Sequence, residues 1–341
     1  LPLWPSLGLP SLHELVSLSA PAALSPVSGV DVKFTDHVAS ENAFQTTTSI
    51  AELIATLDLE SARELARGGI ALPDSKRLAA AMGVDLDRVS GLLDIASRAG
   101  LVALDSGRWM PAEASRTWMV DSSGERWALL ATAWLERLPV DIRTILRERA
   151  HAVWGERLEE YVAWLFPAGD DWMRDRVRVY TRDAELLGIT ADNVPSTPGA
   201  ALLASGADAA ATAMAALFPP EVAEVYLQHD LSIVSPGPLA PPIDARLRTM
   251  ADVEGRALAS IYRVSTASLS RAMAAGETES SIRGFLGGIA LTGIPQPLDY
   301  LLTEAGSRYG LVRVGATPEG RTYGSSTDGT LLRTLVVDHS I

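Results

Sequence analysis

Three stretches near the end of the chain decide its fold: VYLQHDLSIVSPGPL at residues 225–239, GRALASIYRVSTASLSRAM at 255–273 and ETESSIRGFLGGIALTGIPQPLDYLL at 277–302. Alternating apolar residues predict strands over 225–234 and 257–264, and apolar residues at helical spacing predict helices over 242–253, 265–275, 278–292 and 298–309. Ser265, Thr266 and Thr278 are typical N-cap residues, and Gly276 is a typical helix end. Pro219-Pro220 precedes these elements, so we expect a small α+β domain over residues 219–315.

This region carries a family resemblance in residues that are mostly apolar or turn-forming. They are Asp230-Leu231, Pro236-Gly237-Pro238, Tyr262-Arg263-Val264-Ser265, Ile282, Phe285-Leu286, Ile294-Pro295-Gln296-Pro297-Leu298 and Tyr300-Leu301. With them the region resembles the helicase-associated domain of XPB-type DNA helicases, which also occurs in stand-alone bacterial proteins without a motor. The resemblance implies a partnership with DNA or with a helicase in repair or transcription. Apolar and turn-forming residues indicate a fold, and they do not indicate a binding site.

The sequence carries no motif for catalysis. It has no G-x-x-x-x-G-K-[ST] phosphate-binding loop, no G-x-G-x-x-G and no G-x-S-x-G, and its only lysines are Lys33 and Lys76. It has no cysteine, and its five histidines are scattered without metal-ligand spacing. We therefore expect no enzyme, no nucleotide hydrolysis, no cofactor and no metal. Gly284, Gly287 and Gly288 fall within a predicted helix, where close helix packing is the simplest explanation.

Composition limits the possible partners. A chain of 341 residues with 47% hydrophobic and 21% charged residues is expected to form two to four globular domains. Its apolar runs are short, and LPLWPSLGLP at the start lacks the regions of a signal peptide, so we expect a cytoplasmic protein with no membrane partner. A net charge of −13 repels nucleic acid, so binding to DNA would need a local basic patch.

Residues 46–111 have the pattern of a winged helix, after an irregular segment over residues 1–45. Ser49 and Glu52 form a capping-box pattern before a first helix. Two further helices are predicted in DSKRLAAAMGV and DLDRVSGLLDIASRAGL, ended by Gly83 and Gly100, and LVALDSGRWMP then predicts a hairpin that turns at residues 105–107. Helix, turn, helix and hairpin follow one another in the order of a winged helix.

Residues 112–218 are predicted to form a helical block with a second winged-helix-like unit. One apolar face of a first helix carries Trp127, Leu130, Ala131, Trp134, Leu135 and Leu138. A second helix is predicted over 141–165, followed by a third that begins near Asp171. GITADNVP then predicts a short hairpin, and Thr197 is a possible N-cap of a last helix. Residues 316–341 are expected to begin a further, truncated unit.

Two groups of basic residues are candidates for contact with DNA. Arg174, Arg178 and Arg182 recur every four residues, with Arg176 to one side, and would form a basic stripe on the third helix of the block. Asp171, Asp175 and Asp183 are the expected partners that would neutralise this stripe as ordinary helical ion pairs. Lys76, Arg77 and Arg108 form a weaker candidate, beside a Trp109 that we expect to pack at the base of the hairpin.

Three interpretations of function remain open at this point. The first is a non-enzymatic, DNA-associated accessory protein built from winged-helix units and the α+β domain, with DNA, a helicase or another protein as partner. The second is an acidic winged-helix scaffold that binds proteins and makes no contact with DNA, since the helix before the hairpin carries Asp85, Asp87 and Asp94. The third is a small-ligand sensor, which would require an apolar pocket that no motif predicts.

Overall fold

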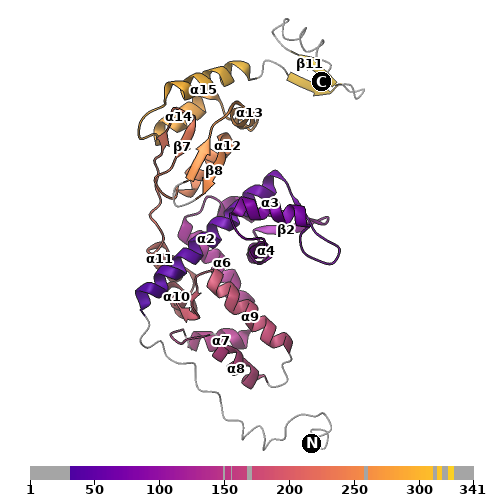
Figure 1. The fold of residues 1–341 in the computed structure, drawn as a ribbon, viewed down its shortest axis with the longest axis vertical. Helices are drawn as coiled ribbons and strands as arrows, with labels where there is room; N and C mark the ends of the chain where they lie inside the picture. Colours follow the sequence, from indigo (N-terminus) through magenta and orange to yellow (C-terminus); the bar gives the residue numbers. More distant parts are fainter. Residues whose placement is uncertain are drawn as a thin grey trace, which may run out of the picture. The chain divides into compact units, whose positions relative to one another are not determined.

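The computed structural model describes residues 31–148, 150–154, 156–166, 171–256, 260–309, 313–316 and 322–325. Two compact units make up the chain, residues 1–218 and residues 219–341. Helices dominate both units, and the strands form small antiparallel sheets (Figure 1). The expected fold class, mainly α with an α+β part, is confirmed.

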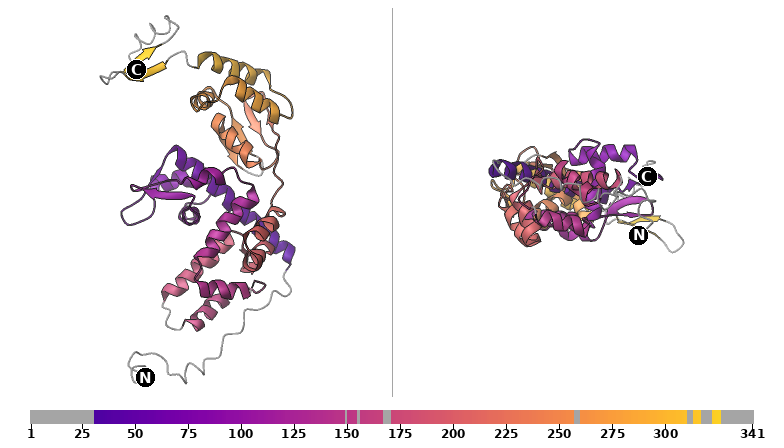
Figure 2. Two further views of the ribbon diagram at one scale, coloured as in Figure 1. Left: turned by 180° about the vertical axis from the view of Figure 1, so that it is seen from behind. Right: turned by 90° about the horizontal axis from the view of Figure 1, so that it is seen from below.

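The first unit is organised around a long helix that the sequence pattern placed wrongly. Helix α2 spans Val32–Leu59, and Asp31 is its N-cap, since the Asp31 side chain accepts hydrogen bonds from the backbone of Lys33 and Phe34. Ser49, expected to cap a helix, lies buried within α2 and donates to the carbonyl oxygen of Met82 at 3.3 Å. The part of the expected irregular segment that is described, residues 32–45, is therefore helical. Helix α2 packs against α3, α4, α6 and α9 and can be followed in Figures 1 and 2.

The elements expected after α2 are present. Helices α3 (Leu72–Met82) and α4 (Arg88–Arg98) are followed by strands β2 (Val102–Asp105) and β3 (Arg108–Pro111). Gly83 ends α3 in the left-handed conformation, and Ser106 and Gly107 turn the hairpin with φ of 49° and 75°. A short strand, β1 (Ala62–Arg63), pairs with β3 and completes a sheet of order β1-β3-β2.

Helices α5 (Ala114–Trp118), α6 (Ser123–Arg137), α7 (Val140–Glu148), α8 (Glu156–Leu165) and α9 (Asp171–Leu186) follow. The apolar face expected on α6 is buried, with Trp127 fully inaccessible and Trp134 5% exposed. The single helix expected over 141–165 is wrong, because the chain leaves the helix between α7 and α8. There the backbone N–H of Trp154 donates to the carbonyl oxygen of Asn193 at 2.8 Å, and the Trp154 ring stacks on Trp134. Tertiary contacts thus interrupt a pattern that is helical throughout.

The first unit ends with β4 (Thr190–Ala191), β5 (Val194–Pro195), α10 (Thr197–Ser205) and α11 (Ala207–Ala215). Ser196, one residue before the expected Thr197, is the N-cap of α10, and its hydroxyl accepts from the backbone N–H of Gly199. At the end of α9, Gly188 has φ of 62° and lies so close to α2 that an added Cβ would be 2.0 Å from the Ala39 carbonyl oxygen. Only glycine allows this close approach.

The second unit contains a sheet of order β6-β7-β9-β8 packed against helices. The strand expected over 225–234 is two strands, β6 (Tyr226–Leu227) and β7 (Ser232–Val234), joined by a turn in which Leu231 has φ of 69°. Helix α12 (Pro241–Met250) ends before Val253, and the following residues form β8 (Asp252–Arg256), which pairs with β9 (Ser260–Arg263). Leu227, Ile233 and Tyr262 lie buried in the core of this unit.

Helices α13 (Thr266–Ala274), α14 (Glu279–Ile289) and α15 (Gln296–Arg308) complete that core. The Ser265 and Thr278 hydroxyls cap α13 and α14, as predicted. The close packing expected at the α14 glycines is not found, because added Cβ atoms on Gly284 and Gly288 would meet nothing within 4 Å. Strands β10 (Arg313–Ala316) and β11 (Thr322–Ser325) pair as a hairpin. The rest of the unit expected over 316–341 lies outside the described residues.

Candidate nucleic-acid interface

The basic stripe lies on the exposed face of α9. Arg174, Arg178 and Arg182 are exposed, and the side chains of Arg178 and Arg182 are 63% and 52% accessible. The opposite face carries Val177 and Ala184, which are buried in the core of the first unit. Helical spacing therefore presents these cations to solvent, as the sequence predicts. The geometry places them on one helix face.

Carboxylates on two helices surround Arg178. Its Nε lies 3.4 Å from Oε1 of Glu159 on α8, and its Nη1 lies 3.5 Å from Oδ1 of Asp175 one turn earlier on α9. The Asp175 side chain is 71% exposed, so water competes with Arg178 for its Oδ1. Ion pairs of this kind contribute about 0–1 kcal/mol, which a phosphate could displace at small cost.

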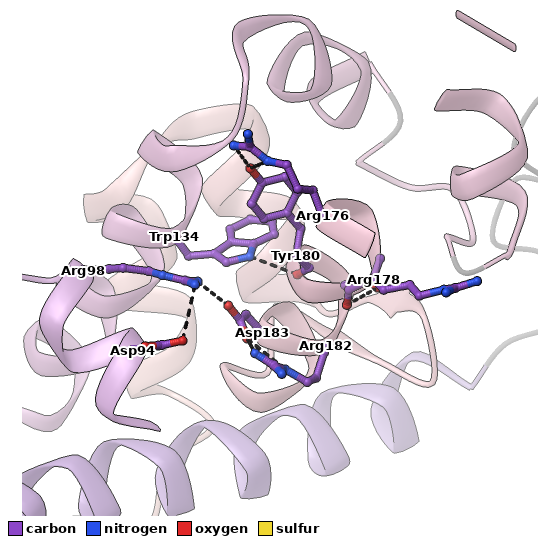
Figure 3. Close-up of polar contacts among 9 residues, drawn as sticks. Asp94, Arg98, Trp134, Arg176, Arg178, Tyr180, Arg182 and Asp183 are labelled. Carbon is purple, nitrogen blue, oxygen red and sulfur yellow. Dashed lines mark hydrogen bonds and ion pairs between the residues drawn. The ribbon is translucent and has the colours of Figure 1, made fainter. Parts of the chain in front are cut away.

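Arg182 is held more firmly, because its partner is buried. Both Arg182 Nε and Nη2 bond to Oδ1 of the fully buried Asp183, at 3.2 and 2.8 Å. The other oxygen, Oδ2, accepts from Nη1 of Arg98 on α4 at 2.6 Å (Figure 3). Arg98 also lies 3.8 Å from Asp94. Asp183 therefore links α9 to α4. The sequence predicted that Asp183 pairs with the stripe on a solvated face; it does pair with Arg182, but its side chain is buried.

Sequence reasoning missed the role of Asp183 and Arg98. The available signal is helical phase, since Asp183 lies three residues after Tyr180 and four before the fully buried Leu187. A carboxylate on an apolar face needs a cationic partner, because an isolated buried charge is very costly. The phase thus indicates that a partner exists, and only the structure identifies it as Arg98.

Arg176 lies beside the stripe and contacts an aromatic ring. Its Nε and Nη2 donate to the Tyr180 hydroxyl at 3.1 and 2.7 Å, and its guanidinium lies 5.8 Å from the ring centroid. The Tyr180 carbonyl oxygen accepts from Nε1 of Trp134 on α6 at 3.0 Å (Figure 3). This arrangement anchors α9 on α6.

The second group of basic residues holds the small sheet together. Arg77 lies 3.0 Å from Asp74 and 3.5 Å from Glu60, and Arg108 donates to the hydroxyl and carbonyl oxygens of Ser61 at 2.6 and 2.9 Å. The backbone N–H of Arg63 and then the Arg77 guanidinium keep the pKa of Asp74 below its usual value. Arg77 and Arg108 thus have structural contacts, whereas Lys76 is exposed on α3. Trp109 is half-buried in the hairpin, and its Nε1 donates to Glu64.

Helix α4, which precedes the hairpin, presents an acidic surface. Val89, Leu92, Leu93, Ile95 and Ala96 are buried, so its inner face packs inside the first unit. The exposed positions at and before this helix include Asp85, Asp87 and Asp94. Carboxylates and phosphates repel each other because both are negatively charged, so this surface is poorly suited to a DNA groove.

The described residues contain no cluster of three or more histidine, cysteine, aspartate or glutamate side chains able to hold a metal ion. Among the same residues, no helix is both long and apolar enough to cross a membrane.

Comparison with protein families finds a match for the C-terminal part of the chain. A family model described as helicase conserved C-terminal domain matches residues 225–341, which begin just before β6 and include α12–α15. No curated protein matches the chain. The family match supports a helicase-related domain over these residues and agrees at that level with the resemblance seen in the sequence.

Proposed function

We propose that this chain is a non-enzymatic accessory protein that associates with DNA, and that it resembles the helicase-associated region of XPB-type helicases and works beside a helicase in repair or transcription. The observation that carries the proposal is the helicase-domain match over residues 225–341. These 341 residues contain no G-x-x-x-x-G-K-[ST] phosphate-binding loop, so the proposed role assigns no nucleotide hydrolysis to them.

The topology of residues 46–111 supports a winged-helix unit. The last turns of α2, then β1, α3, α4 and the β2–β3 hairpin follow one another, and the strands associate in the order β1-β3-β2. The sequence α9, β4, β5, α10 supports a second, smaller unit of related design. Winged helices commonly place a helix and a hairpin against a duplex.

Helix α9 is the proposed contact with DNA, and its arginines are expected to contribute unequally. Glu159 and Asp175, which pair with Arg178, are 24% and 71% exposed, and Arg174 lies one turn away on the same face. Arg182 is bound to the buried carboxylate of Asp183. If Arg182 turned to a phosphate instead, Oδ1 of Asp183 would lose its cationic partner. We therefore assign the phosphate contacts to Arg174 and Arg178.

Fluorescence anisotropy with labelled duplex DNA at several salt concentrations tests this proposal. Two phosphate contacts give a slope of log K against log salt of about −1.8, on the rule of about −0.9 per contact. Removing both in Arg174→Ala/Arg178→Ala should flatten the slope by that amount for every DNA sequence, because phosphate contacts carry no sequence information.

A matched control is Arg271→Ala/Arg308→Ala, which removes two exposed arginines from the second unit and changes the net charge equally. Its DNA affinity should stay close to that of the parent. If the parent fails to bind at low salt, or if both double variants lose affinity equally, α9 is not a DNA site.

A protein-interaction scaffold is the second candidate function, and the acidic outer surface of α4 favours it. Asp85, Asp87 and Asp94 and a net charge of −13 suit a basic protein partner better than a polyanion. If the parent protein does not bind single-stranded, duplex or forked DNA at low salt, the scaffold becomes the leading interpretation.

A further inference from the structure

The first unit contains an open groove that the proposed contact with DNA does not use. The groove has a volume of about 450 Å³ and lies between α6, α11 and the end of α4. Its floor is made largely of small side chains, which are Ala128, Ala133, Ala207 and Ala211. Beside it α6 and α11 meet closely, since a Cβ added to Gly124 would lie 3.1 Å from the Ala211 carbonyl oxygen.

The rim of the groove is acidic. Glu125 and Glu136 on α6 and Asp208 on α11 line it with exposed carboxylates. Within the described part of the chain neither Glu136 nor Asp208 has an ion pair. Glu125 accepts from the Ser122 hydroxyl and backbone at 2.6 and 3.0 Å, and these bonds hold the pKa of its carboxyl below the usual value.

The one arginine that lines the groove does not balance this charge. Arg98 donates to the buried Asp183 at 2.6 Å and lies 3.8 Å from Asp94, so its positive charge already has two carboxylate partners. The groove therefore presents an excess of negative charge over an apolar floor.

Two further residues of the lining, Thr132 and Leu129, suit a bound partner. The hydroxyl oxygen of Thr132, a lining residue, is buried without a hydrogen-bond partner. Leu129, on the same helix face, is 39% exposed and offers apolar contact. An occupant with an apolar surface would cover Leu129, and rotation of the Thr132 side chain about χ1 would bring its hydroxyl to a polar group on that occupant.

We propose that this groove binds a lysine- or arginine-bearing amphipathic helix of a partner protein. Alanine floors allow the backbone of a helix to approach closely, and carboxylates along the rim complement basic residues flanking its apolar face. The groove is too open for a small molecule, which is normally enclosed over most of its surface. The rim carboxylates also repel nucleic acid.

The probe is a fluorescein-labelled synthetic peptide of about 18 residues, long enough to populate a helix, with Leu and Ala on one face and Lys on the flanks. Anisotropy titrations with the full chain compare the parent with Glu136→Gln/Asp208→Asn. Neutralising two carboxylates should weaken binding about fivefold to tenfold, as expected for the loss of two partly exposed charge pairs. A peptide with Glu in place of Lys should not bind.

Two more variants make the result specific to the groove. Ala133→Leu fills part of the groove at unchanged charge, so it should also weaken the peptide. Asp58→Asn/Glu224→Gln removes two exposed carboxylates that do not line the groove, so it should bind like the parent. Far-UV circular dichroism confirms that each variant is folded.

Equal binding by the parent and Glu136→Gln/Asp208→Asn, or equal losses in that variant and the Asp58/Glu224 control, would overturn the proposal. So would an unchanged affinity in Ala133→Leu, because the peptide would then be attracted by overall charge. Duplex DNA titrated into the same variants separates this inference from the proposed function, since the groove variants should leave DNA affinity at or above the parent value.

Discussion

Trp134 shows how single side chains hold the helical block together. It is 5% exposed, its ring stacks on Trp154 with centroids 6.3 Å apart, and its Nε1 donates to the Tyr180 carbonyl oxygen at 3.0 Å. The same residue therefore contacts the loop between α7 and α8 and also helix α9. Removing the ring deletes apolar contacts and leaves a cavity that the surrounding helices fill only partly.

We expect Trp134→Ala to lower the free energy of unfolding of the first unit by about 3–5 kcal/mol. Trp134→Phe keeps an aromatic ring but loses the N–H donor, so it should cost less. The measurement is urea unfolding followed by the fluorescence of the remaining tryptophans. An unchanged midpoint in Trp134→Ala would show that this position is not part of the core.

The phase of a residue on its helix could be predicted from the sequence, but its partner on another helix could not. Trp127 and Trp134 belong to one apolar face of α6 by spacing alone, and both are buried. Asp183 and Arg98 are 85 residues apart, and no local pattern connects them. The exposure of the α9 arginines could likewise be predicted from their spacing. The contact of Arg178 with Glu159 could not, because Glu159 belongs to another helix, α8.

At the scale of elements, local signals located some helix ends and missed others. Ser265, Thr278 and Gly83 define the ends of α13, α14 and α3 by bonds within a few residues, which a sequence displays directly. The middle of α2, QTTTS at residues 45–49, is polar, and its buried Thr46 and Ser49 donate to carbonyl oxygens of Leu186 and Met82. These tertiary contacts explain why a sequence pattern started the helix too late.

Arg246 joins α12 to α14 and to the loop before α14, and it gives a prediction for pH. From α12 it donates two hydrogen bonds to Glu277, at 3.0 and 3.1 Å, and its guanidinium lies 4.4 Å from the ring centroid of Phe285 on α14. The Arg246 hydrogen bonds, followed by that from the Ser281 hydroxyl, hold the pKa of Glu277 below its usual value. A lowered folded-state pKa means that the ionised carboxylate stabilises the fold.

The stabilisation by Glu277 should be complete above the pKa of an unfolded glutamate, about 4.3, and should be lost as the pH falls through the lower folded-state pKa. At neutral pH Glu277→Gln should therefore be less stable than the parent by at most about 1 kcal/mol, because Arg246 is partly exposed. Unfolding of the second unit, followed by circular dichroism between neutral and acid pH, should show the two proteins converging in acid. A stability difference that does not change with pH would contradict the role of the ionised pair.

At the scale of the whole molecule, each unit has a hydrophobic core of its own. One cluster of buried residues runs from Ala43 to Phe218, and the other from Val225 to Ala305. The family match begins at residue 225 and so falls entirely within the second unit. A core that is complete within one unit is the usual condition for a domain that folds as a cooperative whole.

We therefore expect the two units to unfold in separate transitions, and the distribution of aromatic residues makes this measurable. All eight tryptophans precede Pro219, so tryptophan fluorescence reports the first unit alone. Circular dichroism at about 222 nm, near the minimum of the helix band, reports the helices of both units. Leu302→Ala, in the second core, should cost about 2–5 kcal/mol. It should shift only the circular dichroism transition that has no counterpart in fluorescence. Trp134→Ala should shift the fluorescence transition. If both probes gave one coincident transition that either substitution moved equally, the chain would unfold as a single cooperative body, and the two cores could not be independent.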